Sequence, residues 1–136
     1  MIKKSAGVFL LREERGEIFV LALVGRNSWD LPKGGIREKE SPFQAAKREL
    51  LEETGISEVV WGFGDKEIAP FKVTYTLRNK TNKEVTFFVA TTKKHKVCVS
   101  NEHLSYKWLS LPQAKESLPG RFHGLVDFFR ELIFSG

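Results

Sequence analysis

RELLEETG, residues 48–55, is the stretch on which the fold prediction rests, because it ends an expected helix with three glutamates. The helix is expected to begin at Pro42, since Ser41 and Gln44 form a capping-box pattern around this proline. Gly55 is the expected stop, because glycine readily takes the left-handed conformation that ends many helices. The apolar stripe of this helix would be Phe43, Ala46, Leu50 and Thr54. We therefore expect one helix with one buried face.

The three glutamates, Glu49, Glu52 and Glu53, are unfavourable for the helix itself. Glu49 and Glu53 are like charges four residues apart, and Glu52 and Glu53 face the negative end of the helix dipole. At about 100° per residue, the three side chains share roughly a third of the helix circumference. They form either a solvated charged face or a site for a hard divalent cation such as Mg²⁺, which selects carboxylate oxygens.

Outside this helix the chain is expected to form mainly strands. AGVFLLRE (6–13) and EIFVLALVG (17–25) predict a hairpin with Gly16 in its turn, and residues 26–40 predict an ordered loop. Further strands are expected at VVWGFG (59–64), FKVTYTLR (71–78), EVTFFVATT (84–92), KVCVS (96–100) and YKWLSL (106–111). The tail RFHGLVDFFRELIF (121–134) has the apolar spacing of an amphipathic helix.

This order, β-β-α-β-β-β-α, predicts an α/β (α+β) fold in which a mixed β-sheet lies between helices. At 136 residues the chain is expected to form a single domain over 1–136. The net charge of +5 indicates an anionic partner, whether nucleotide, phosphate, nucleic acid or an acidic surface.

The cysteine count and the length of the apolar runs indicate the cellular compartment in which the protein is expected. The single cysteine, Cys98, excludes an internal disulfide and fits a cytoplasmic location, and the strand expected around it makes it a packing residue. No apolar run approaches transmembrane length, so no membrane partner is expected.

The spacing around the helix resembles the Nudix box of the Nudix hydrolases. Gly34 is followed after five residues by Glu40, and after seven more by RELLEETGI (48–56), with no departure from the pattern. The resemblance implies a Nudix-type α/β/α sandwich and a Mg²⁺ or Mn²⁺ cofactor. It also implies cleavage of a nucleoside diphosphate linked to another moiety.

The same resemblance implies roles for individual residues. The implied metal ligands and catalytic carboxylates are Glu49, Glu52 and Glu53, one of which also helps to activate water. Arg48 would orient these glutamates, the Gly34 region would give a backbone carbonyl to the metal, and Glu40 would be a structural anchor. The flanking cations that would bind phosphates are Lys33, Arg26, Arg37 and Lys39, with Lys33 foremost.

A narrower similarity links the chain to the asymmetric diadenosine tetraphosphate hydrolases. It rests on WDLPKGG (29–35), TYTLRNK (74–80) and SNEHLSYKWLSLPQA (100–114). The resemblance makes Glu102 a further metal ligand and catalytic carboxylate, against the alternative of a plain loop carboxylate. Tyr75 would stack on a nucleobase or else belong to the core, and Lys80 or Lys83 would contact phosphate. His103 would lie near the site without a catalytic role.

The function expected from this similarity is asymmetric hydrolysis of diadenosine tetraphosphate to ATP and AMP. The alternatives are a pyrophosphohydrolase that removes oxidised nucleoside triphosphates and an RNA 5′-pyrophosphohydrolase, which the charge of +5 would suit. A non-catalytic module that binds nucleotide or RNA is a further alternative, but such a module is expected to have lost the box carboxylates. The expected partner is therefore a dinucleoside polyphosphate or an RNA 5′ end, with no obligate protein partner.

Overall fold

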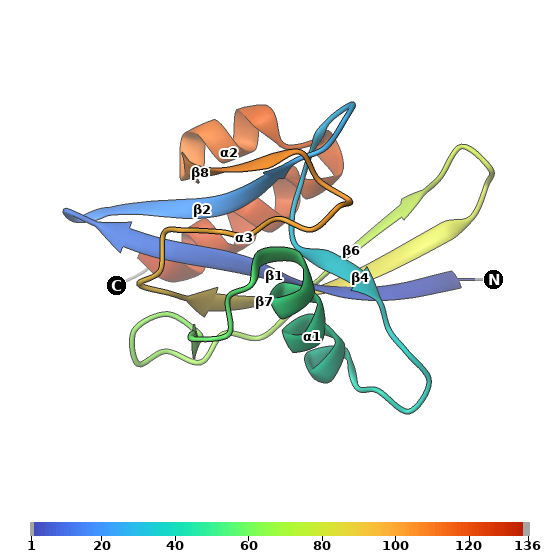
Figure 1. Ribbon diagram of the computed structural model, residues 1–136, viewed down its shortest axis with the longest axis horizontal. Coiled ribbons are helices and arrows are strands. Elements are labelled where there is room, and N and C mark those ends of the chain that lie inside the picture. The colour runs from blue at the N-terminus through green and yellow to red at the C-terminus, as the bar shows by residue number, and fades with distance from the viewer. Residues whose placement is uncertain (1, 135–136) are drawn as a thin grey trace.

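In the computed structural model, residues 2–134 are described, and they form an eight-stranded sheet with three α-helices (Figure 1). The strands are β1 (Ile2–Glu14), β2 (Glu17–Val24), β3 (Trp29–Asp30), β4 (Lys33–Gly35), β5 (Val60–Trp61), β6 (Phe71–Thr76), β7 (Asn82–Thr91) and β8 (Ser105–Ser110). The helices are α1 (Pro42–Thr54), α2 (Leu111–Ser117) and α3 (His123–Phe134), with a 3₁₀ turn, η1, at Gly120–Phe122. No helix within residues 2–134 is long and apolar enough to cross a membrane.

The sheet is mixed, as the sequence predicts. β1 runs parallel to β7 and antiparallel to both β2 and β4. β6 and β5 add to β7 in antiparallel orientation, and β8 adds to β2. β1 and β7 therefore form the centre of the sheet, and the short strand β4 attaches to β1 near the chain's N-terminal end.

Alternation along β1 divides the core into two layers. Phe9 points to the face covered by α2 and α3, where it contacts Phe129 with ring centroids 5.0 Å apart. Val8 and Leu10 point to the opposite face and pack with Leu50 of α1. The helices thus lie on both sides of the sheet (Figure 1). This confirms the α/β/α sandwich.

α1 begins and ends where the sequence predicts. The Ser41 hydroxyl accepts a hydrogen bond from the Gln44 backbone N–H, and the Gln44 side chain accepts one from the Ser41 backbone N–H. Gly55 has φ of 73° and donates its N–H to the Leu51 carbonyl. These contacts are local, which explains why the sequence alone locates the helix.

One member of the predicted stripe of α1 is not buried. Ala46, Leu50 and Thr54 are buried, but Phe43 is 37 % exposed. The Phe43 and Trp61 rings instead pack edge to face, with their centroids 4.7 Å apart. The prediction was wrong at Phe43, because its ring packs against Trp61 and Phe88 at the sheet surface and is still partly open to solvent.

The strand predicted at 96–100 is absent from the described structure, which has no regular element between β7 and β8. Cys98 is exposed rather than packed in a strand, so the prediction for this residue was wrong. Its backbone N–H donates to the Thr54 carbonyl at 3.0 Å, so the segment is fixed to the end of α1 instead of to a neighbouring strand.

Two helical features near the C-terminal end differ from the prediction. α2 was not predicted, although Ser110 and Gln113 form the same capping box that begins α1. α3 begins at His123 rather than at residue 121, because residues 120–122 form η1.

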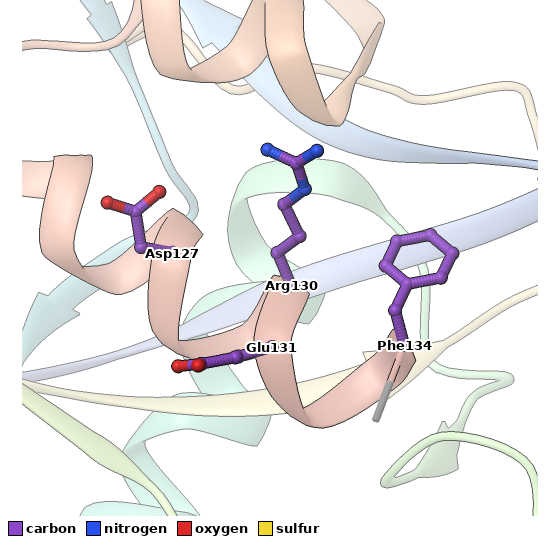
Figure 2. A pocket seen from close by; sticks show the side chains of 4 residues that line it. All are labelled: Asp127, Arg130, Glu131 and Phe134. Atoms are coloured by element: carbon purple, nitrogen blue, oxygen red, sulfur yellow. The ribbon is translucent and has the colours of Figure 1, made fainter. Parts of the chain in front are cut away.

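The outer face of α3 carries an open hollow of about 700 Å³ (Figure 2). It is lined by Asp127, Arg130, Glu131 and Phe134.

Candidate active site

β4 directs two consecutive residues to opposite faces of the sheet. Gly34 pairs with Ala6 of β1, and Lys33 pairs with Gly7. Because side chains alternate along a strand, Gly34 faces α1, whereas Lys33 faces the side that carries α3. The carboxylate of Glu49 lies directly against the Gly34 backbone, so a β-carbon at Gly34 would collide with it. The missing side chain therefore makes room for a carboxylate.

Glu53 lies one turn beyond Glu49 and faces the loop before β8. Its Oε1 accepts a hydrogen bond from the Lys33 backbone N–H at 2.9 Å, and the residue is 4 % exposed. One ligand atom each from Glu53, Glu102 and His103 lie within 4.8 Å of one another. We call Glu49, Glu53 and Glu102 the carboxylate cluster. It joins two segments that are far apart in the sequence.

The loop that carries Glu102 is held by backbone hydrogen bonds. The His103 N–H donates to the Ser100 carbonyl at 3.2 Å, and the Leu104 N–H donates to the Val24 carbonyl at 2.8 Å. The Glu102 N–H also faces the Ser100 hydroxyl at 3.4 Å. These bonds fix the Glu102–His103 pair beside α1 although it belongs to no helix or strand.

Two carboxylates of the cluster, Glu49 and Glu53, resist ionisation. Burial raises the pKa of Glu49, and the neighbouring Glu52 and Glu102 carboxylates add to this effect against the opposing charge of Arg48. Burial likewise raises the pKa of Glu53 to about 8, although the Lys33 N–H opposes the shift. A divalent cation would supply the positive charge that these carboxylates lack, and carboxylate oxygens suit Mg²⁺ and Mn²⁺. The donor set therefore fits the metal that the sequence predicts.

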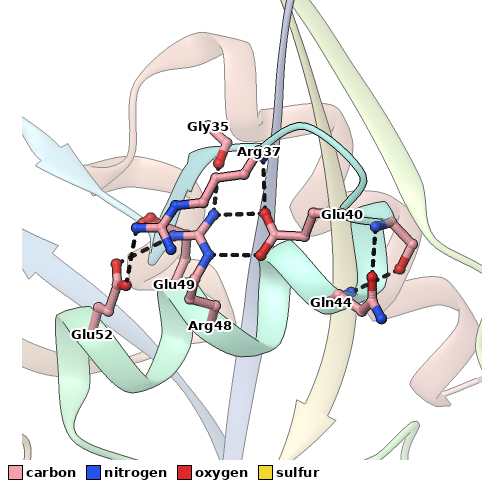
Figure 3. Close-up of polar contacts among 8 residues, drawn as sticks. Gly35, Arg37, Glu40, Gln44, Arg48, Glu49 and Glu52 are labelled. Atoms are coloured by element: carbon pink, nitrogen blue, oxygen red, sulfur yellow. Dashed lines mark hydrogen bonds and ion pairs between the residues drawn. The ribbon is translucent and has the colours of Figure 1, made fainter.

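Arg48 lies on the other flank of α1 and is tied to Glu40 (Figure 3). Its Nε donates to Glu40 Oε2 at 2.7 Å, and its Nη2 donates to Glu40 Oε1 at 2.9 Å and to the Gly35 carbonyl at 2.8 Å. Glu40 also accepts from the Arg37 backbone N–H at 2.9 Å. The Arg48 hydrogen bonds are the main cause that lowers the pKa of Glu40 to about 2. We call Arg48 and Glu40 the arginine clamp.

Glu52 differs from the other two glutamates of α1. Its side chain is 47 % exposed, and it forms ion pairs with Arg48 at 3.3 Å and with Arg37 at 3.6 Å (Figure 3). Arg48 also lies 3.5 Å from Glu49, so it touches both carboxylates. Of the three metal ligands predicted on α1, two therefore face the β4 strand and the Glu102 loop, and Glu52 lies at the outer edge.

Asp30 connects Lys33 to His103, a contact that the sequence did not indicate. Lys33 Nζ lies 3.2 Å from Asp30 Oδ2, and His103 Nε2 lies 3.8 Å from the same oxygen. Burial alone would raise the pKa of Asp30, but the His103 hydrogen bond and the Lys33 charge lower it. The predicted phosphate-binding lysine thus lies beside the carboxylate cluster, held by an aspartate.

A basic row crosses the sheet on the face that carries α3. Lys83 of β7 lies opposite Lys3 of β1 and opposite Tyr75 of β6. Arg121 of η1 lies over the Tyr75 ring, 4.6 Å from its centroid. Burial lowers the pKa of Lys83, and the charges of Lys33 and Lys3 lower it further. We call Lys3, Lys83 and Arg121 the basic row; cross-strand register reveals Lys3 as a member, and the contact with the Tyr75 ring reveals Arg121.

Two further predicted phosphate contacts, Lys80 and Arg26, lie in exposed turns. Lys80, with φ of 66°, is in the turn between β6 and β7, and Arg26 is in the turn between β2 and β3. Within residues 2–134 neither forms an ion pair. Tyr75 is half-buried against the core and covered by Arg121, so it is not an open platform.

Comparison with known protein families decides the assignment. The chain matches the NUDIX domain over residues 1–131. It belongs to the NUDIX family. The carboxylate cluster and the arginine clamp accordingly lie within a NUDIX domain.

Solved structures resemble this Nudix domain over nearly its whole length. A Caenorhabditis elegans Ap4A hydrolase in a binary complex is 25% identical, with a TM-score of 0.86 over 96% of this chain and 97% of that chain. A MutT protein from Methanosarcina mazei is 26% identical, with a TM-score of 0.77 over 98% of this chain and 96% of that one.

Similarity to curated proteins is more local. An RNA pyrophosphohydrolase from Thioalkalivibrio sulfidiphilus is 43% identical over 54 residues, which is 40% of this chain and 31% of that protein. This chain thus spans about a third of the length of the curated relatives that it matches.

Proposed function

We propose that this Nudix domain is a divalent-metal-dependent pyrophosphohydrolase that cleaves diadenosine tetraphosphate asymmetrically to ATP and AMP. The observation that carries the proposal is the meeting of Glu102 with Glu53, whose carboxylate also accepts from the Lys33 backbone N–H. The narrower resemblance predicts this carboxylate from the loop before β8. The full-length likeness to an Ap4A hydrolase supports the same substrate.

The proposed ion would be held by the carboxylate cluster. Glu53 and Glu102 would contribute oxygens from the side of the β8 loop, and Glu49 would contribute from the side of Gly34. Glu52 lies further out, where it would reach the ion only after leaving its arginine partners. When bound, the ion supplies Lewis acidity and neutralises phosphate charge.

The cluster also provides the proton acceptor for the attacking water. A general base works best when its pKa lies near the working pH, and burial moves the pKa of Glu53 and of Glu49 in that direction. We assign proton acceptance to one of these two carboxylates. Arg48 is anchored to Glu40 and lies 3.5 Å from the Glu49 carboxylate. Arg48 would therefore keep Glu49 in place.

The cations on the other face of β4 would bind the polyphosphate. Lys33 and Lys83 lie close enough for the charge of Lys33 to lower the pKa of Lys83, and an anion between them would relieve this repulsion. Tyr75 would receive an adenine ring only after Arg121 moved from its face. Arg121 could itself stack on the base, since guanidinium groups stack on aromatic rings.

A second candidate is removal of 5′ pyrophosphate from RNA. The 43% identity to an RNA pyrophosphohydrolase over 54 residues favours it, as does the net charge of +5. The basic row on the α3 face would bind the triphosphate end of an RNA equally well. The intact carboxylate cluster argues against a module that binds nucleotide without turnover.

Product analysis separates these candidates. Purified protein with Mg²⁺ is expected to convert diadenosine tetraphosphate to equimolar ATP and AMP, rather than to two ADP. Triphosphorylated RNA and oxidised dGTP, tested at matched concentration, are expected to react more slowly. Preferred turnover of either one would overturn the substrate assignment. Absence of turnover on all three with Mg²⁺ and with Mn²⁺ would overturn the enzyme proposal.

Variants of single lysines test the phosphate contacts. Lys33→Met and Lys83→Met are expected to raise KM for diadenosine tetraphosphate, because each removes a cation from the proposed phosphate-binding face. Lys80→Met is the matched control, since Lys80 lies in an exposed turn without an ion pair in the described part of the chain. An equal effect of all three variants would contradict the proposed binding face.

A further inference from the structure

His103 is a buried histidine with one ring nitrogen that lacks a partner. Its side chain is 8 % exposed, and Nε2 faces Asp30 Oδ2 at 3.8 Å. Its Nδ1 is buried and has no hydrogen-bond partner among residues 2–134. A buried polar atom without a partner costs free energy and calls for an explanation, which includes an absent ion. The ring therefore faces a carboxylate on one side and is unsatisfied on the other.

The ring lies beside two carboxylates of the cluster. A ring nitrogen of His103 and one oxygen each from Glu53 and Glu102 lie within 4.8 Å of one another. Ligands of one ion at about 2.0–2.2 Å are separated by no more than about 4.4 Å. Small side-chain adjustments would thus bring the three atoms to a common ion. The feature that distinguishes this group from an ordinary acidic surface is the buried imidazole.

We propose that His103 provides a nitrogen ligand to the divalent ion, with Asp30 orienting the ring through the opposite nitrogen. This inference rests on the proposed function, because it requires an ion at the carboxylate cluster. Metal-binding histidines commonly direct their second ring nitrogen to a carboxylate, which fixes the ring and strengthens the ligand.

Asp30 is itself well placed to orient a ligand. Its Oδ1 accepts a hydrogen bond from the Leu31 backbone N–H at 2.8 Å, and its Oδ2 faces Lys33 Nζ at 3.2 Å. Both oxygens are therefore positioned before an ion arrives. Asp30 is a positioning residue, and it acts on the ion through His103.

A nitrogen ligand changes which ion the site prefers. Imidazole suits transition metals, whereas Mg²⁺ prefers an all-oxygen set. The wild-type domain is therefore expected to bind Mn²⁺ more tightly than Mg²⁺, and His103→Gln is expected to narrow that difference. Isothermal titration with each metal alone gives both dissociation constants without any substrate.

Pulsed electron paramagnetic resonance of bound Mn²⁺ tests the ligand directly. Protein labelled with ¹⁵N at histidine is expected to show a nitrogen coupling that differs from that of ¹⁴N protein. The coupling is expected to be absent in His103→Gln and retained in His95→Gln, a control at an exposed histidine between β7 and β8. Bound Mn²⁺ without nitrogen coupling in the wild type would overturn the inference.

The controls separate this inference from the proposed function. Mn²⁺ binding that is lost in Glu53→Gln, but shows no nitrogen coupling in the wild type, would overturn only the histidine ligand. Absence of Mn²⁺ binding to the wild type would overturn the metal site of the proposed function together with this inference. Retention of the coupling in His103→Gln would assign it to another residue and also overturn the proposal.

A double-mutant cycle tests the role of Asp30. Asp30→Asn is expected to weaken Mn²⁺ binding by about 10–100-fold, the usual effect of removing a carboxylate that orients a ligand. In the His103→Gln background the same change is expected to have little effect. Equal losses in both backgrounds would show that Asp30 acts on the fold or on charge alone, and would overturn its positioning role.

Discussion

The two flanks of α1 hold carboxylates in opposite electrostatic states. On one flank, Glu40 receives two hydrogen bonds from Arg48, and its pKa falls to about 2. On the other flank, burial raises the pKa of Glu53 to about 8. The arginine clamp is thus neutralised within the protein, whereas the carboxylate cluster needs a cation from outside. The difference separates a structural use of glutamate from a proposed catalytic one.

The largest expected effect tests this division by activity. Glu53→Gln is expected to reduce turnover by about 10²–10⁴-fold, the usual contribution of a proton-transferring group. Glu40→Gln loosens the anchor of Arg48 but removes no carboxylate of the cluster, so it is expected to lower turnover far less than Glu53→Gln. Steady-state kinetics on diadenosine tetraphosphate with Mg²⁺ measures both. A similar loss in the two variants would erase the distinction between the flanks.

Metal-dependent stability gives the next largest effect. Saturating Mg²⁺, at about 100 times its dissociation constant, is expected to stabilise the wild type by about 2.7 kcal/mol. The shift in melting temperature is expected to be much smaller in Glu52→Gln/Glu53→Gln. Glu40→Gln is expected to keep the full shift. If Mg²⁺ shifted the melting temperature of all three proteins equally, the carboxylates on α1 would be a plain surface face.

The two glycines of β4 form a matched pair for the third prediction. Gly34→Ala places a β-carbon against the Glu49 carboxylate, whereas a β-carbon at Gly35 meets nothing within 4 Å. Gly34→Ala is expected to cost about 1–3 kcal/mol, as overpacking does, and to lower turnover by displacing Glu49. Gly35→Ala is expected to change both little. Thermal unfolding and kinetics of the two variants provide the comparison.

The smallest expected effect is the pH dependence of stability without metal. Glu53 has a raised folded-state pKa, so its contribution is fully present below about 4.5 and is lost as pH rises towards about 8. Glu40 has a lowered pKa, so its contribution is present above about 4.5 and is lost as pH falls towards about 2. Melting temperatures measured against pH in EDTA are expected to fall by a few degrees on the alkaline side and by a few degrees on the acid side.

Substitutions at each carboxylate assign these slopes. Glu53→Gln is expected to flatten the slope on the alkaline side, and Glu40→Gln is expected to flatten the slope on the acid side. The raised pKa of Glu53 would be contradicted if the metal-free stability of the wild type rose between pH 5 and pH 8 and Glu53→Gln removed that rise.

Local sequence patterns predicted α1 well and the C-terminal region less well. Ser41, Gln44 and Gly55 define the limits of α1 by contacts within a few residues, so no distant partner was needed. The same logic applied to Ser110 and Gln113 would have found α2. The strand expected around Cys98 failed because alternation does not reveal whether a neighbouring strand is available.

The sequence by itself determined the family and the three glutamates of α1, since spacing along one helix is a local property. Only the tertiary structure decided that Glu52 lies at the edge while Glu102 and His103 join Glu53. It also decided that Lys83 lies beside Lys3. These placements depend on strand register and on a loop docked against α1, because such contacts join residues that are distant along the chain.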